Sequence, residues 1–98
     1  MKALKIEGCT VVPVNIENTL EALQAAVDGY IETVTLIPGK AVMIVNEEGL
    51  LQGMVPNPAA SMIAGTKIVG PALIVGVDGE EFTDFPAEIR QQIDELFA

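Results

Sequence analysis

Neutral polar side chains gather in one glycine- and proline-rich stretch of the sequence, between residues 46 and 70. The stretch reads N-E-E-G-L-L-Q-G-M-V-P-N-P-A-A-S-M-I-A-G-T-K-I-V-G and contains four glycines and two prolines. Glycine permits, and proline fixes, special backbone angles, while amide and hydroxyl groups offer hydrogen bonds without charge. This pattern predicts a ligand-binding segment. Its candidate contacts are Asn46, Met54, Asn57, Ser61, Thr66 and Lys67, to which Arg90 from the C-terminal part is added.

Lys67, next to Thr66, is the best cation in this segment for holding a phosphate group. A phosphate cradle uses glycines that expose consecutive N–H groups, preferably at a helix start with a nearby lysine. The sequence I-A-G-T-K-I-V-G loosely fits that description, but it contains neither a G-x-G-x-x-G motif nor a P-loop lysine motif. The alternative is that G-T-K-I-V-G is simply the start of a strand. Met54 also has two interpretations, because a flexible thioether suits either a core gap or an adaptable pocket.

The sequence contains no arrangement of side chains that would catalyse hydrolysis. It has no histidine, so its single cysteine has no imidazole to activate it. The paired carboxylates Glu47-Glu48 and Glu80-Glu81 stand beside turn glycines, where adjacent side chains point apart into water. The turn sequence D-G-E-E also lacks the ligand number of a calcium loop. We therefore expect a protein without catalytic activity, bound metal or cofactor.

Length, composition and charge limit the class of function. A chain of 98 residues forms a single domain, residues 1–98, and 50% of its residues are hydrophobic. A domain of this size has too little interior to cover them all, so we expect a homo-oligomer; the alternative is a monomer with an apolar surface. The net charge of −9 opposes binding to nucleic acid or an anionic membrane and attracts basic proteins. Alternatively, the acidity only maintains solubility.

Cysteine usage and the first residues of the sequence indicate the compartment. Cys9 is the only cysteine, so no disulfide can form within one chain. The initial sequence M-K-A-L-K-I-E-G lacks the long apolar core of a secretion signal, because Lys5 and Glu7 interrupt it. No apolar run is long enough to span a membrane. These features predict a cytoplasmic protein.

Secondary-structure patterns predict an α+β fold with a small mixed or antiparallel sheet. Runs rich in β-branched residues are separated by turn residues, and amphipathic runs carry apolar side chains at helical spacing. Strands are expected at 2–7, 11–16, 30–37, 41–46, 66–69 and 72–77, the last two as one kinked strand or as two strands that meet at a corner. Helices are expected at about 18–28, about 58–63 and about 85–97.

Particular residues mark the expected ends of the first elements. Pro13 places the second strand at a sheet edge or in a bulge, because proline cannot donate a ladder hydrogen bond. Asn18 is expected to cap the first helix, and Gly29 to end it. Pro58 fits the first turn of the middle helix, which Gly65 ends.

The last helix carries an apolar stripe that includes Ile89, Ile93 and Phe97. Thr83 or Asp84 is expected to cap it, and the stripe predicts packing on the sheet. The alternative is that the stripe forms a seam between subunits.

Three stretches of the sequence resemble a known family. They are M-K-A-L-K-I-E at 1–7, I-E-N-T-L-E-A-L-Q-x-x-V-x-G-Y-I-E at 16–32, and V-N-E-E-G-L-L-Q-G-M-V-P-N-P-A-A to I-A-G-T-x-I-V-G at 45–70. The family consists of small proteins from bacteriophages and Gram-positive mobile elements and is described only as a domain of unknown function. The resemblance implies a small accessory protein in the host bacterial cytoplasm.

Two hypotheses from different classes follow from this setting and from the residues. The first is a non-catalytic protein that sequesters a nucleotide-derived host immune signal, such as a cyclic oligonucleotide or an ADP-ribose derivative, and so counteracts antiviral defence. Its basis is analogy with small phage oligomers of unrelated sequence, and the charge of −9 opposes it. The second is an acidic inhibitor that covers a basic face of a host nuclease or DNA-binding enzyme. A structural or regulatory phage factor without a small ligand is the third possibility.

Overall fold

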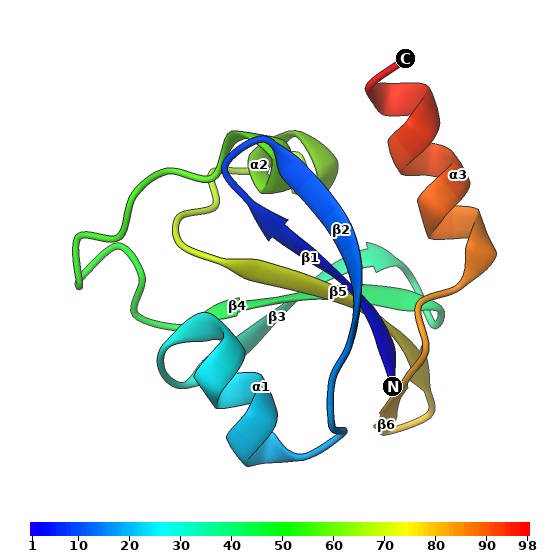
Figure 1. Ribbon diagram of the computed structural model, residues 1–98, viewed down its shortest axis with the longest axis horizontal. Helices are drawn as coiled ribbons and strands as arrows, with labels where there is room; N and C mark the ends of the chain where they lie inside the picture. Colours follow the sequence, from blue (N-terminus) through cyan, green and yellow to red (C-terminus); the bar gives the residue numbers. More distant parts are fainter.

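A six-stranded antiparallel sheet forms the centre of the structure, and three helices pack around it (Figure 1). The computed structural model describes residues 1–98. The strands are β1 (Lys2–Glu7), β2 (Thr10–Asn15), β3 (Ile31–Ile37), β4 (Ala41–Asn46), β5 (Ala72–Asp78) and β6 (Glu81–Thr83). The helices are α1 (Leu20–Val27), α2 (Pro58–Ala64) and α3 (Ala87–Leu96). The α+β class is confirmed, with the sheet antiparallel throughout.

The order of the strands is β2-β1-β5-β4-β3, and β6 also pairs with β5. Strand β1 pairs with the first part of β5, where Leu4 lies opposite Ile74, and β6 pairs with the last part, where Val77 lies opposite Phe82. Both outer edges are formed by hairpin strands, β2 and β3. Pro13 lies in the edge strand β2, as its missing N–H predicted.

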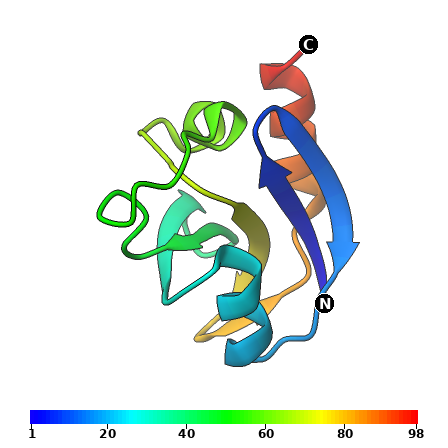
Figure 2. The ribbon, with the colours of Figure 1, turned by 60° about the vertical axis from the view of Figure 1, so that its left-hand side comes forward.

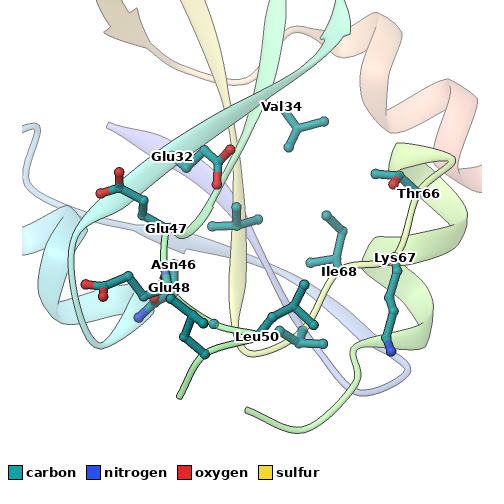
Figure 3. Close-up of a pocket in the computed structure, with 13 residues that line it drawn as sticks. Glu32, Val34, Asn46, Glu47, Glu48, Leu50, Thr66, Lys67 and Ile68 are labelled. Carbon is teal, nitrogen blue, oxygen red and sulfur yellow. Dashed lines mark hydrogen bonds between the residues drawn. The ribbon is translucent and has the colours of Figure 1, made fainter. Parts of the chain in front are cut away.

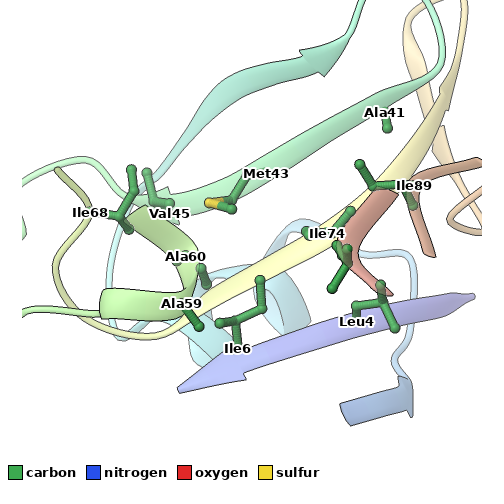
Figure 4. Close-up of a cluster of buried hydrophobic side chains, with 12 residues drawn as sticks. Leu4, Ile6, Ala41, Met43, Val45, Ala59, Ala60, Ile68, Ile74 and Ile89 are labelled. Atoms are coloured by element: carbon green, nitrogen blue, oxygen red, sulfur yellow. The ribbon is translucent and has the colours of Figure 1, made fainter. Parts of the chain in front are cut away.

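Apolar side chains cover both faces of the sheet, and β4 is buried along its whole length. On one face, Met43 and Val45 pack with residues of α2 and α3, among them Ala60 and Ile89 (Figure 4). On the other face, alternate residues of β4 and β5 pack with residues of α1. That second cluster consists of Ala3, Leu23, Val27, Val42, Ile44, Leu73 and Val75. Successive side chains of β4 point to opposite faces of the sheet, so this strand contributes residues to both hydrophobic clusters.

The first and last helices begin at residues other than those predicted. Thr19, not Asn18, caps α1, because its hydroxyl accepts a hydrogen bond from the N–H of Ala22 at 3.2 Å. Asn18 instead donates to the carbonyl of Phe82 at 2.8 Å and ties the helix start to β6. Helix α3 has no side-chain cap. The expected capping residue Asp84 accepts from the N–H of Lys2 at 2.7 Å.

The segment at 66–69 is not a strand. It forms one isolated β-bridge, between Val69 and Pro56, and the carbonyl of Ile68 accepts a hydrogen bond from the N–H of Asn57 at 2.9 Å. The short strand β6 was not predicted, because its three residues are too few to show a pattern. In Figures 1 and 2 the loop between β4 and α2 extends away from the sheet. No helix has the length and apolar character that crossing a bilayer requires.

Candidate functional site

A hollow of about 460 Å³ opens beside the end of β4 (Figure 3). Four parts of the chain surround it: β3, the end of β4, the turn that follows β4, and the segment between α2 and β5. The lining residues are Glu32, Val34, Val45, Asn46, Glu47, Glu48, Gly49, Leu50, Leu51, Thr66, Lys67, Ile68 and Val69. The hollow therefore combines the two hairpin strands β3 and β4 with both ends of the glycine-rich stretch.

Three glutamates line one side of the hollow (Figure 3). Glu32 is carried by β3, and the N–H of Glu47 extends the β3–β4 ladder by donating to the carbonyl of Tyr30 at 2.9 Å. The N–H of Glu48 donates to Oδ1 of Asn46 at 2.7 Å, which fixes the turn after the strand. None of the three carboxylates forms an ion pair within the chain. This side of the hollow is an exposed, uncompensated negative surface.

Apolar side chains form the floor and the lip of the hollow. Val45 and Ile68 are buried and belong to the core on the α2 face. Leu50 and Leu51, in the turn after β4, are 67% and 86% exposed. Neither leucine belongs to either buried core, and exposed apolar side chains rimmed by charge are typical of interaction surfaces.

Thr66 and Lys67 lie on the side of the hollow opposite the glutamates (Figure 3). Both are exposed, and Lys67 forms no ion pair. Of the five basic residues, three are paired with nearby carboxylates: Lys5 with Glu7, Lys40 with Glu88, and Arg90 with Asp94. Lys67 is thus the one cation that the hollow contains.

Asn46 lines the hollow, but its amide group is bonded inside the fold. It is 5% exposed, and its Nδ2 donates to the carbonyls of Val27 and Asp28 at 3.0 and 3.1 Å. Its Oδ1 accepts from Glu48. Asn46 therefore bonds the last carbonyls of α1 and shapes the turn, and its side-chain donors and acceptor are already engaged.

Asn57 lies outside the hollow and is 2% exposed. It is the N-cap of α2, where its Oδ1 accepts from the N–H of Ala60 at 3.2 Å. Its Nδ2 donates to the carbonyls of Ile6 and Gly70 at 2.9 and 2.8 Å. Because both amide hydrogens and the oxygen are engaged, the side chain has no donor free for a ligand.

The remaining candidates are also placed apart from the hollow. The Ser61 hydroxyl donates to the carbonyl of Asn57 at 2.8 Å and accepts from the N–H of Ile68 at 2.8 Å. Met54 packs against Gly70, where an added Cβ would lie 2.6 Å from the Met54 sulfur. Arg90 lies on α3, where it pairs with Asp94 at 3.4 Å. The structure therefore brings together only Asn46, Thr66 and Lys67 of the seven predicted contacts.

The glutamates and the two exposed leucines were not among the predicted site residues. The signal for them is the sequence N-E-E-G-L-L, in which two leucines follow a turn directly after a strand. A turn without apolar burial ordinarily carries polar residues, so the leucines were the unusual feature. No three carboxylate or thiol groups in the chain lie close enough together to hold a metal ion.

A second apolar region lies between α2 and α3. A groove of about 230 Å³ there is lined by Leu36, Met62, Ile63, Ile89, Gln92, Ile93 and Leu96. Met62 and Leu96 at its rim are exposed. The homo-oligomer expected from the composition stays a prediction, which sedimentation velocity of the purified protein would check.

Comparison with known proteins gives one result. No curated protein and no solved structure matches the chain. A family model described as a domain of unknown function, DUF3846, matches residues 1–98. The match covers the whole described fold, including the hollow and its acidic side. The chain therefore belongs to the DUF3846 family, which confirms the resemblance to an uncharacterised family.

Proposed function

We propose that this protein is a non-catalytic binding protein, and that its hollow engages a basic, partly apolar surface of another protein. The observation that carries the proposal is the composition of the hollow, where three unpaired glutamates adjoin two exposed leucines. A net charge of −9 adds long-range attraction for a cationic partner. Charge complementarity raises the association rate, while the apolar contacts supply affinity.

The resemblance noted above implies a bacteriophage or mobile-element setting. In that setting we propose a basic DNA-binding or nuclease component of the host as the partner, which the acidic protein inhibits by covering its basic face. Such a partner already presents lysine and arginine to phosphates. Glutamates that take the place of phosphates would compete directly with nucleic acid. No reacting group is needed for this mode of inhibition.

The first test is affinity capture from a bacterial lysate at low and at high salt, followed by titration calorimetry with the captured partner. The informative variant is Glu47→Gln with Glu48→Gln, and its matched control is Glu80→Gln with Glu81→Gln. Both variants remove two carboxylates beside a turn glycine, but only the first pair lines the hollow. We expect the first to weaken binding by about tenfold or more, and the control to have a much smaller effect.

Two outcomes would contradict this proposal. Equal weakening by both variants would mean that the general negative field, not the hollow, attracts the partner. If no partner is captured in a salt-sensitive manner, charge-driven protein binding itself is excluded.

A nucleotide-derived immune signal is the second candidate ligand. The observation in its favour is that Lys67, free of any ion pair, shares the hollow with Thr66. The three glutamates opposite weaken this candidate, because they repel phosphate. Titration calorimetry with cyclic dinucleotides and cyclic ADP-ribose isomers tests it: Lys67→Ala is expected to abolish binding and the Glu47→Gln, Glu48→Gln variant to tighten it. Absence of heat from every compound would remove this candidate.

A further inference from the structure

We infer that the outer edge of β3 binds an extended, lysine- or arginine-bearing segment of the partner as an added strand. This inference rests on the proposed function and specifies the conformation in which the partner binds beside the hollow. A peptide that adds to a sheet edge gains affinity from main-chain hydrogen bonds and specificity from alternate side chains.

The outer main-chain groups of β3 are unpaired. β3 is the last strand of the sheet, and its only partner strand is β4. Because the N–H of Glu47 donates to the carbonyl of Tyr30, residues 30 and 47 form a hydrogen-bonded pair of the ladder. Such pairs alternate with non-bonded ones in an antiparallel ladder. Ile31, Thr33 and Thr35 therefore direct their N–H and C=O groups away from β4.

The side chains of β3 divide between the two faces of the sheet. Glu32 and Val34 lie opposite Val45 and Met43, on the face of the hollow. In an added antiparallel strand, the residues opposite Glu32 and Val34 would form non-hydrogen-bonded pairs, in which side chains approach most closely. Every second side chain of the partner segment would thus point into the hollow.

The charge around this edge selects a cationic segment over a second copy of the chain. β3 contains no lysine or arginine, and Glu32 is its only charged residue. Pairing two copies edge to edge would bring their acidic hollows together, and each copy carries a charge of −9. A lysine or arginine opposite Glu32 would instead meet a carboxylate across the strands. The register shift between Thr35 and Ile37 limits the regular edge to the first five residues of β3, 31–35.

The experiment that tests this inference uses amide hydrogen exchange, followed by NMR, with and without a peptide in which lysine alternates with valine. We expect exchange to slow by about tenfold or more at Ile31, Thr33 and Thr35, whose N–H groups are free in the protein alone. A peptide of the same sequence with methyl groups on alternate backbone nitrogens is expected to give no protection. A peptide with glutamate in place of lysine is expected not to bind.

Two outcomes of this experiment overturn the inference. Binding of the methylated peptide as strongly as the unmethylated one would show that the edge makes no main-chain hydrogen bonds. Concentration-dependent protection of Thr33 and Thr35 without any peptide would show that the edge belongs to a second copy of the chain.

A pair of variants tests the same edge with the captured partner. Thr33→Pro removes the outward N–H without touching the bonds to β4, so an edge strand tolerates it. Thr33→Val keeps the N–H and is its control. We expect only Thr33→Pro to weaken binding, by about tenfold. If the folded Thr33→Pro protein keeps salt-sensitive binding at full strength, the inference of an added strand is wrong, but the proposal that the acidic hollow binds the partner is not contradicted. If Thr33→Pro does not fold, the methylated peptide decides.

Discussion

The side-chain amide of Asn57 donates to the carbonyl of Gly70 at 2.8 Å, and this bond ties the start of α2 to the entrance of β5. A second bond from the same nitrogen reaches the carbonyl of Ile6 in β1 at 2.9 Å. One buried side chain thus joins three parts of the fold that are distant in sequence. In low-dielectric surroundings such hydrogen bonds are strong, and a buried polar group left without its hydrogen bond is costly.

Asn57→Ala should therefore destabilise the protein by about 3 kcal/mol, because it orphans two carbonyls and removes a helix cap. Urea denaturation followed by circular dichroism measures this free energy. Asn15→Ala, at an exposed position of β2, is the control and should stay within about 0.5 kcal/mol of the parent protein. A loss below about 1 kcal/mol for Asn57→Ala would contradict the structural role.

Ser61→Ala should cost about 1 to 2 kcal/mol, because the hydroxyl accepts from the N–H of Ile68 at 2.8 Å and donates within α2. Thr66→Ala removes a hydroxyl five residues later in the chain, where it is exposed and bonds nothing inside the fold. That variant should leave the denaturation midpoint unchanged. Equal effects of the two variants would mean that Ser61 does not hold the segment before β5.

Gly76→Ala should destabilise the sheet by about 3 kcal/mol. A Cβ at this position would overlap the carbonyl oxygen of Asp84, which is main chain and cannot rotate away. Gly39→Ala is a useful comparison, because no atom lies near its added Cβ and only the positive φ of 72° opposes the change, at about 1 kcal/mol. The midpoints of thermal unfolding measure the difference, and we expect a lower midpoint for Gly76→Ala than for Gly39→Ala. The reverse order would show that β5 and β6 separate freely.

The ion pair between Lys40 and Glu88 should make the attachment of α3 depend on pH. The hydrogen bond between Lys40 Nζ and Glu88 Oε2, at 2.7 Å, lowers the pKa of Glu88 below its ordinary value of 4.5 and raises the pKa of Lys40 above 10.5. A lowered acid pKa contributes stability above pH 4.5, which is lost as the pH falls through the lowered value. The raised lysine pKa contributes stability below pH 10.5, which is lost above the raised value.

An NMR titration of the Glu88 carboxyl checks this prediction directly. In Lys40→Met, the pKa of Glu88 should rise towards its ordinary value. Protonation of Glu88 should then no longer weaken the attachment of α3 in acid. An unchanged titration in Lys40→Met would show that the pair is open in solution, as many surface pairs are.

The strands and helices were predictable from sequence where local chemistry decides them. β-branched runs on either side of Gly8-Cys9 and Pro38-Gly39 are the β1–β2 and β3–β4 hairpins. Pro58 and Gly65 bound α2 as expected. The predicted capping residues of α1 and α3 were wrong. Asn18 and Asp84 instead form hydrogen bonds with main-chain groups that are distant in sequence. Local patterns carry no information about such long-range partners.

The candidate site was predictable only in part, for the same reason. The cap role of Asn57 was accessible, since asparagine before proline at a helix start is a known signature. Its bonds to Ile6 and Gly70 depend on strands far away in the sequence. Lys67 and Thr66 do line the hollow, but Glu32 joins them only because β3 pairs with β4.

The pairing of β1 with β5 also has a consequence for synthesis on the ribosome. Strand β1 is synthesised before the other strands of the sheet, whereas its inner neighbour β5 follows only after residue 71. Until then the N-terminal hairpin has an open inner flank, and a hairpin alone is marginally stable in water. The inner flank of β1 therefore stays unpaired until β5 has been synthesised. Wide sequence separation of this kind slows folding and favours late, cooperative completion of the sheet.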